Sequence, residues 1–146
     1  MKRSEIKTKI RRGFSLIELV VVVVILGLVA AIAIPRTSRG AAGAAESAQA
    51  ADIATLRNAI EMYKTEHGGT LPAAATFEAQ LTQYTNDAGG TSATPSGTHI
   101  YGPYLSAIPP QKIGSRKGEN GVATADAATV GWIYNETTGV ITVNDP

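Results

Sequence analysis

The sequence contains no cysteine, and aromatic residues make up only 5% of it. The first absence excludes a disulfide framework and a thiolate metal site. The second leaves few large side chains for a hydrophobic core, so a folded domain of this chain must rely on a small core or on contacts with neighbouring molecules. At 146 residues the chain has room for one ordinary domain.

Motifs for catalysis are also missing. No phosphate-binding loop occurs, and Ser15 lies outside any G-x-S-x-G context. His67 and His99 are single histidines without an acid or a second ligand at a recognisable spacing. His67 is better explained as the end of a helix, where a cation is favourable, and Trp132 as part of a small core. The sequence therefore gives no case for an enzyme.

Positive charge is concentrated at the N-terminus. Residues 1–13 hold six basic side chains and one acid, whereas seven basic and eleven acidic residues remain from residue 14 onward. The long C-terminal part is therefore acidic, which argues against nucleic-acid binding through a basic face.

An apolar run of 21 residues, 14–34, follows the basic block and contains one charge, Glu18. As a helix it would be about 30 Å long, the thickness of a bilayer core. The positive-inside rule places the basic residues before it in the cytoplasm and the rest of the chain across the membrane. We therefore expect residues 14–34 to form a transmembrane and assembly helix.

The helix is expected to continue beyond the apolar run. Pro35 and the glycines after it predict a kinked or melted stretch over residues 35–43. Apolar residues then recur at helical spacing as far as His67, and Gly68-Gly69 is a stop signal. This divides the chain into a basic leader (1–13), the apolar helix (14–34), a kinked continuation (35–67) and a small globular domain (68–146).

The C-terminal end has the pattern of a β-hairpin. Apolar residues alternate from Val130 to Tyr134, residues 140–143 are β-prone, and residues 135–139 between them have turn chemistry. The expected fold class is α+β, a long N-terminal helix with a small antiparallel sheet packed on its second half.

The stretch Arg11-Arg12-Gly13-Phe14-Ser15-Leu16-Ile17-Glu18-Leu19, which joins the basic leader to the apolar helix, resembles the type IV pilin-like family. This family comprises type IV pilins and the pseudopilins of type II secretion and competence systems. The resemblance implies cleavage after Gly13 by prepilin peptidase and N-methylation of the new N-terminus, Phe14. It also makes Glu18 the fifth mature residue, a position that takes part in subunit assembly.

The chemistry of Glu18 can be argued separately. An acid within an apolar membrane helix costs about 2.5–3.5 kcal/mol on insertion scales, and less near the interface. The α-amine that cleavage frees at Phe14 is a cation one helical turn away. It can pair with Glu18 of the same chain or of an adjacent subunit, and the resemblance favours the adjacent subunit.

Two further segments are similar to major type II pseudopilins, residues 59–72 at the end of the helix and residues 102–109 before the sheet. The resemblance implies a homopolymeric helical filament, minor pseudopilins, and an inner-membrane platform protein driven by an assembly ATPase. It places the chain as a single-pass protein of the bacterial inner membrane with its C-terminal domain in the periplasm.

One departure from the family concerns calcium. The Asp-Pro-Trp-Gly run usual after the loop is replaced here by residues 110–114, Pro-Gln-Lys-Ile-Gly, so the family's calcium site does not carry over. No cofactor is therefore expected. Calcium is left as an alternative, with Asp126 and Asp145 as candidate ligands because hard cations prefer oxygen.

Two alternative functions remain open from the sequence. A type IV pilin for adhesion or motility is the first, although its globular domain is often closed by a disulfide, which this chain lacks. A signal-anchored exported binding domain is the second, because Ala31-Ile32-Ala33 fits a signal-peptidase site. Against the second, the apolar run is long for a signal peptide, and an acid near its start is unusual there.

Overall fold

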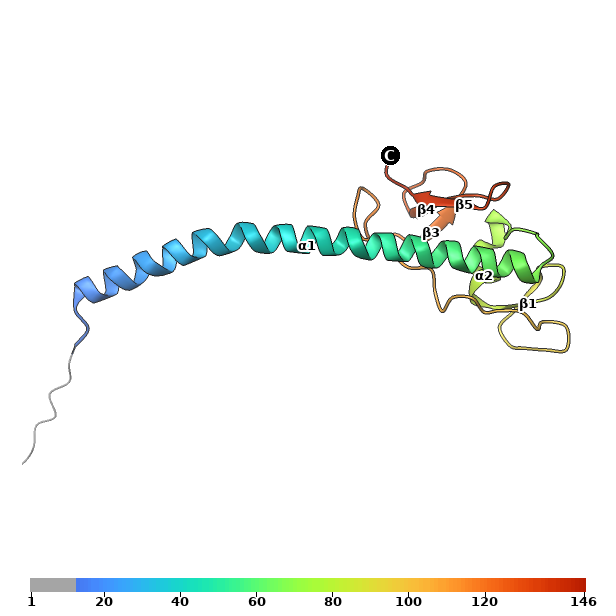
Figure 1. Cartoon of the computed structure of the whole chain (residues 1–146), viewed down its shortest axis with the longest axis horizontal. Helices are drawn as coiled ribbons and strands as arrows, with labels where there is room; N and C mark the ends of the chain where they lie inside the picture. The colour runs from blue at the N-terminus through green and yellow to red at the C-terminus, as the bar shows by residue number, and fades with distance from the viewer. Residues whose placement is uncertain (1–12) are drawn as a thin grey trace, which may run out of the picture. The chain divides into compact units, whose positions relative to one another are not determined.

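The computed structural model describes residues 13–146, and within the first helix it gives side chains up to residue 31 and again from residue 40. The elements in order are α1 (Leu16–Glu66), the 3₁₀ helix η1 (Ala74–Thr76), α2 (Phe77–Thr82), β1 (Tyr84–Thr85), β2 (Thr91–Ser92), β3 (Gly121–Ala123), β4 (Val130–Asn135) and β5 (Val140–Val143). The chain divides into two compact units, Met1–Ala41 and Ala42–Pro146, and the second contains the end of α1 together with every strand (Figure 1).

Helix α1 is continuous over its 51 residues, including residues 35–43. The prediction of a melted stretch there is therefore wrong, while a bend at Pro35 stays a prediction. Alanine has the highest intrinsic helix propensity of the residue types. The sequence after Gly40 is rich in alanine, which favours helix on the C-terminal side of the proline. The helix ends at Glu66, one residue before the predicted end, and Gly68 and Gly69 follow it with positive φ angles.

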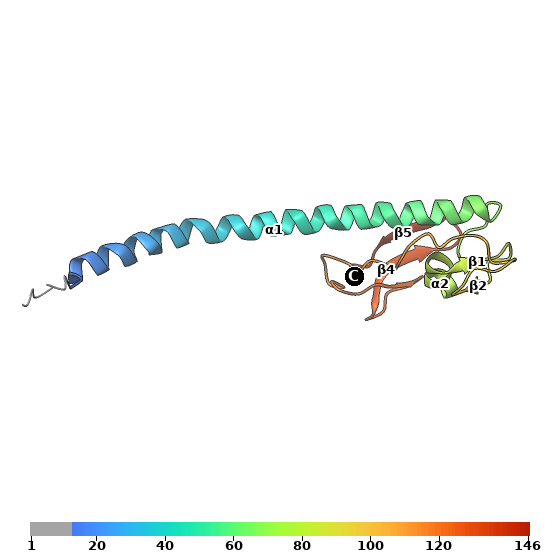
Figure 2. The same cartoon turned by 90° about the horizontal axis from the view of Figure 1, so that it is seen from below.

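The core of the second unit lies between α1 and the C-terminal strands. Side chains recurring at three and four residues along α1 meet the inner face of the hairpin, and Figure 2 shows β4 and β5 beside the second half of the helix. The α1 and hairpin members of this core are Leu56, Ala59, Ile60, Tyr63, Trp132, Tyr134 and Ile141. Trp132 and Leu56 are both completely buried, so the prediction that the tryptophan belongs to a small core is confirmed.

The predicted hairpin is present. Strands β4 and β5 pair antiparallel, from Trp132 opposite Val143 to Asn135 opposite Val140. The turn is organised by Asn135, whose side-chain oxygen accepts N–H bonds from Thr137 (2.9 Å) and Thr138 (3.0 Å). This is the local side-chain bonding that makes asparagine a turn residue.

The sheet is not purely antiparallel, which corrects the expected architecture. Its order is β3-β4-β5, and β3 pairs parallel to β4. Parallel neighbours usually need a long crossover. Here β3 is only three residues long, about 10 Å, so the short connection from residue 124 to 129 is sufficient for the return. Position 131 in β4 must be glycine, because a Cβ there would lie 2.1 Å from the carbonyl oxygen of Glu119, just before β3.

A second sheet was not predicted. Strands β1 and β2 form an antiparallel pair of two residues each, with Tyr84 opposite Ser92 and Thr85 opposite Thr91. His67 fixes this region to the end of α1. The residue is 7% exposed, its ring stacks on Tyr63 at 3.8 Å between ring centroids, and its Nε2 lies 3.0 Å from the carbonyl oxygen of Asn86. His67 is therefore a packing residue at the helix end.

Candidate functional site

The predicted cleavage position lies at the start of the described chain. Gly13 and Phe14 precede α1 in non-helical backbone. A Cβ built on Gly13 would meet no atom within 4 Å, and Phe14 is 81% exposed. A peptidase that binds a peptide along its main chain needs uncovered backbone outside a helix. The structure leaves this peptide bond accessible.

Glu18 lies in the first turn of α1. The carbonyl oxygen of Ser15 accepts the backbone N–H groups of Glu18 (3.1 Å) and Leu19 (3.2 Å), which makes Ser15 the N-cap residue of α1. An acid in the first turn is favoured by the partial positive charge of the helix N-terminus. This second role of Glu18 was not predicted, although the spacing Ser-x-x-Glu is the signature of a capping box.

The first part of α1 is apolar on all sides and uncovered. Thirteen large apolar side chains between residues 14 and 29 are 44–81% exposed. They are Phe14, Leu16, Ile17, Leu19, Val20, Val21, Val22, Val23, Val24, Ile25, Leu26, Leu28 and Val29. A helix that is hydrophobic all round is stable only when other apolar matter covers it. Glu18 is the only charge among these residues, and its side chain is also exposed.

Among the described helical residues, no segment is both long enough and apolar enough to cross a membrane.

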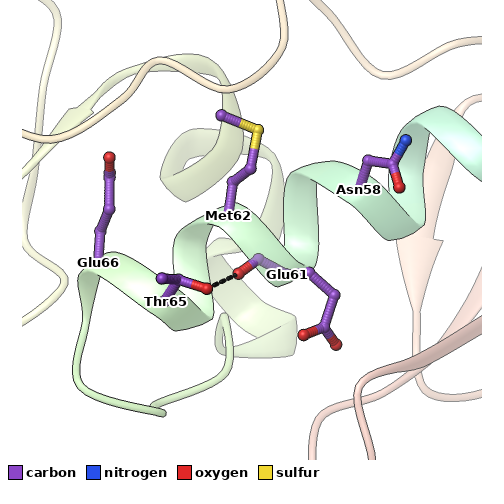
Figure 3. Close-up of a pocket in the computed structure, with 5 residues that line it drawn as sticks. All are labelled: Asn58, Glu61, Met62, Thr65 and Glu66. Atoms are coloured by element: carbon purple, nitrogen blue, oxygen red, sulfur yellow. Dashed lines mark hydrogen bonds between the residues drawn. The ribbon is translucent and has the colours of Figure 1, made fainter.

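A groove with a volume of about 500 Å³ lies on the surface of α1 in the second unit. It is lined by one helix alone, through Asn58, Glu61, Met62, Thr65 and Glu66 (Figure 3). The two carboxylates point in different directions in Figure 3, and the Thr65 hydroxyl donates to the backbone carbonyl of Glu61 at 2.7 Å. The groove therefore lacks a pair of groups arranged for acid–base or nucleophilic chemistry.

The two histidines set aside in the sequence analysis have local partners. The Nδ1 atom of His67 lies 2.8 Å from the carbonyl oxygen of Tyr63, and that of His99 lies 3.0 Å from the hydroxyl of Ser96. Within residues 13–31 and 40–146, no three histidine or acidic side chains converge in a way that suits a metal ion.

One comparison with known proteins identifies the N-terminal region. Residues 8–34 match the family model of the prokaryotic N-terminal methylation motif. The chain thus carries a type IV pilin-like leader, which is consistent with prepilin peptidase processing, methylation and filament assembly. The match contains Gly13, Phe14 and Glu18, and it ends where the apolar run ends. No curated protein and no solved structure matched the chain.

Proposed function

We propose that this protein is a structural, non-enzymatic subunit of a type IV pilin-like filament. The observation that carries the proposal is the methylation motif over residues 8–34, in which a helix with exposed apolar side chains on every side contains one acid in its first turn. In this function prepilin peptidase cleaves after Gly13, Phe14 becomes the methylated N-terminus, and residues 14–34 span the inner membrane. The second unit is then periplasmic.

Assembly transfers this helix from lipid to a bundle of like helices. Both environments are apolar, so the transfer gains little from the hydrophobic effect and depends on packing and polar pairing. Pairing Glu18 with the α-amine of Phe14 in a neighbouring copy satisfies both charges. Removing one member of a buried pair costs about 3–5 kcal/mol. The pair therefore both drives assembly and sets the register between subunits.

Within this class we propose the major pseudopilin of a type II secretion system. Residues 59–72 and 102–109 support this assignment by their resemblance, and the absence of cysteine is unlike many type IV pilins. The partners are further copies of the chain, minor pseudopilins, and a platform protein driven by a cytoplasmic ATPase. No cofactor is needed for a structural role.

Deletion of the gene in the native bacterium tests this subtype. We expect exported enzymes to accumulate in the periplasm, measured as their activity in periplasmic and culture fractions, with adhesion and twitching motility unchanged. Complementation with the wild-type gene serves as the control. Loss of adhesion or motility with normal secretion would instead assign the chain to the type IV pilins.

A further inference from the structure

Three segments that are distant in sequence meet beside the C-terminal strand. The loop after residue 110 folds back on itself, because the N–H of Gln111 donates to the carbonyl oxygen of Glu119 (2.9 Å) and the N–H of Gly118 donates to that of Gln111 (2.8 Å). The loop then contacts Asp126 and the end of the chain through side chains. We call residues Ser115, Arg116, Asp126, Asn144 and Asp145 the C-terminal clasp.

Asp126 is the centre of the clasp. Its Oδ1 accepts bonds from Arg116 Nε (3.1 Å), Arg116 Nη2 (2.8 Å) and Asn144 Nδ2 (2.7 Å), and its Oδ2 accepts from Arg116 Nη2 at 3.0 Å. Asn144 is 3% exposed and also donates to the carbonyl oxygen of Val130 at 2.7 Å, which ties the clasp to β4. Two guanidinium nitrogens on one carboxylate give a directional, charge-assisted contact, stronger than an ordinary surface ion pair.

Asp145 forms the second contact. Its Oδ1 accepts the backbone N–H of Ser115 (3.0 Å) and the Ser115 hydroxyl (2.9 Å). Gly114, just before, has a φ of +86°, and a Cβ there would lie 3.0 Å from Asp145 Oδ1. The turn therefore needs glycine for the loop to come this close to the chain end.

These contacts decide whether calcium fits Asp126 and Asp145. Calcium takes six to eight oxygen ligands, whereas the bonded oxygens of Asp126 face N–H donors, two of them on a cation. The amide oxygen of Gln111 is buried without a hydrogen-bond partner in the described structure. The Gln111 amide oxygen and the second carboxylate oxygen of Asp145 are too few for the six to eight oxygen ligands of calcium. The residues present do not fit the ion.

We propose that Arg116 serves as an internal cation that holds this loop, so that the fold of the C-terminal end does not depend on a divalent ion. The guanidinium neutralises Asp126 and joins the loop to β4 through Asn144, while Ser115 and Asp145 close the other side. This inference goes beyond filament assembly, and its test does not require a filament.

The charges of the clasp also predict its behaviour in acid. The pKa of Asp126 is held below its ordinary value by the hydrogen bond from Asn144 and then by Arg116, and that of Asp145 by Ser115. A carboxyl whose pKa is lower in the folded state stabilises the fold fully above its unfolded value of about 3.9. That contribution is lost as the pH falls through the folded pKa.

The test is thermal unfolding of the full-length chain in detergent, followed by the fluorescence of Trp132, the only tryptophan. Trp132 is a local reporter because its Nε1 donates to the carbonyl oxygen of Pro109 at the start of the loop (2.8 Å). We expect millimolar CaCl₂ or EDTA to leave the wild-type midpoint unchanged. We expect Arg116→Gln to lower it by about 4 °C or more, and Arg116→Lys, which keeps the charge without the fork, to lower it by less.

Lys117→Gln is the matched control. Lys117 is the next residue, is exposed and forms no ion pair within the described part of the chain, so its midpoint should equal that of the wild type. The proposal is overturned if calcium raises the wild-type midpoint by several degrees. It is also overturned if Arg116→Gln and Lys117→Gln unfold at the same temperature. If Arg116→Gln does not fold, the unfolding midpoint of Arg116→Lys is compared with that of Lys117→Gln instead.

Discussion

Glu18→Ala is expected to be cleaved like the wild type and to assemble poorly. The proposed function places the acid of the precursor near the membrane interface, where its removal should not hinder cleavage. In the proposed filament, loss of the acid would leave the α-amine of Phe14 buried without a partner, which costs about 3–5 kcal/mol. That corresponds to at least about a 100-fold loss in subunit association. The measurement is the yield of sheared filaments, by immunoblot and electron microscopy, relative to the amount of mature subunit in the membrane.

Glu46→Ala is the control for this experiment. Glu46 is another exposed acid on α1, in the second unit, and lies outside the apolar run. Its removal should leave the yield close to that of the wild type. Normal filament yield from Glu18→Ala would refute the pairing role, whereas equal losses from both variants would indicate a general requirement for negative charge on the helix.

Gly13→Val is expected to block processing. The residue before the cut must allow the peptidase to approach an extended main chain, and a branched side chain there displaces the peptide from the catalytic groups. A displacement on the order of 1 Å can cost about 100-fold in rate. Immunoblots of membranes after a pulse of expression should show precursor in place of mature protein, and no filaments.

Gly27→Val provides the matched glycine substitution. Gly27 lies within the apolar helix, and a Cβ there would meet no atom within 4 Å. Cleavage of this variant should be normal, since the change is far from the cut and adds to a run of valines. A mature product of normal length from Gly13→Val would contradict the assignment of the cleavage site.

The N-terminal methylation motif could be predicted from sequence because its residues are close together along the chain. Gly13, Phe14 and Glu18 lie within six residues, and the apolar run that follows is long and nearly free of charge. The C-terminal hairpin was predictable for a similar reason, since the alternation around Trp132 and the turn at Asn135 are local patterns. Its pairing closes at Asn135 opposite Val140, next to that turn.

The remaining features depend on contacts between distant segments. Strand β3 has three residues and no alternation, so its parallel pairing with β4 is decided by tertiary packing. The clasp joins Arg116 to Asp126 and Asn144, which no local pattern brings together. The continuity of α1 past Pro35 reflects the strong helix propensity of the alanines that follow, which outweighed the signals for a melted stretch.

Cleavage after Gly13 with methylation of Phe14 is tested by the intact mass of the protein isolated from membranes of the native organism. We expect a chain of residues 14–146 that carries one added methyl group on Phe14. A chain that begins at Ile34 would show an ordinary secreted domain, cleaved after Ala33. A chain that keeps residues 1–13 would show a simple membrane anchor. Either result would contradict the proposed role as a pilin-like subunit.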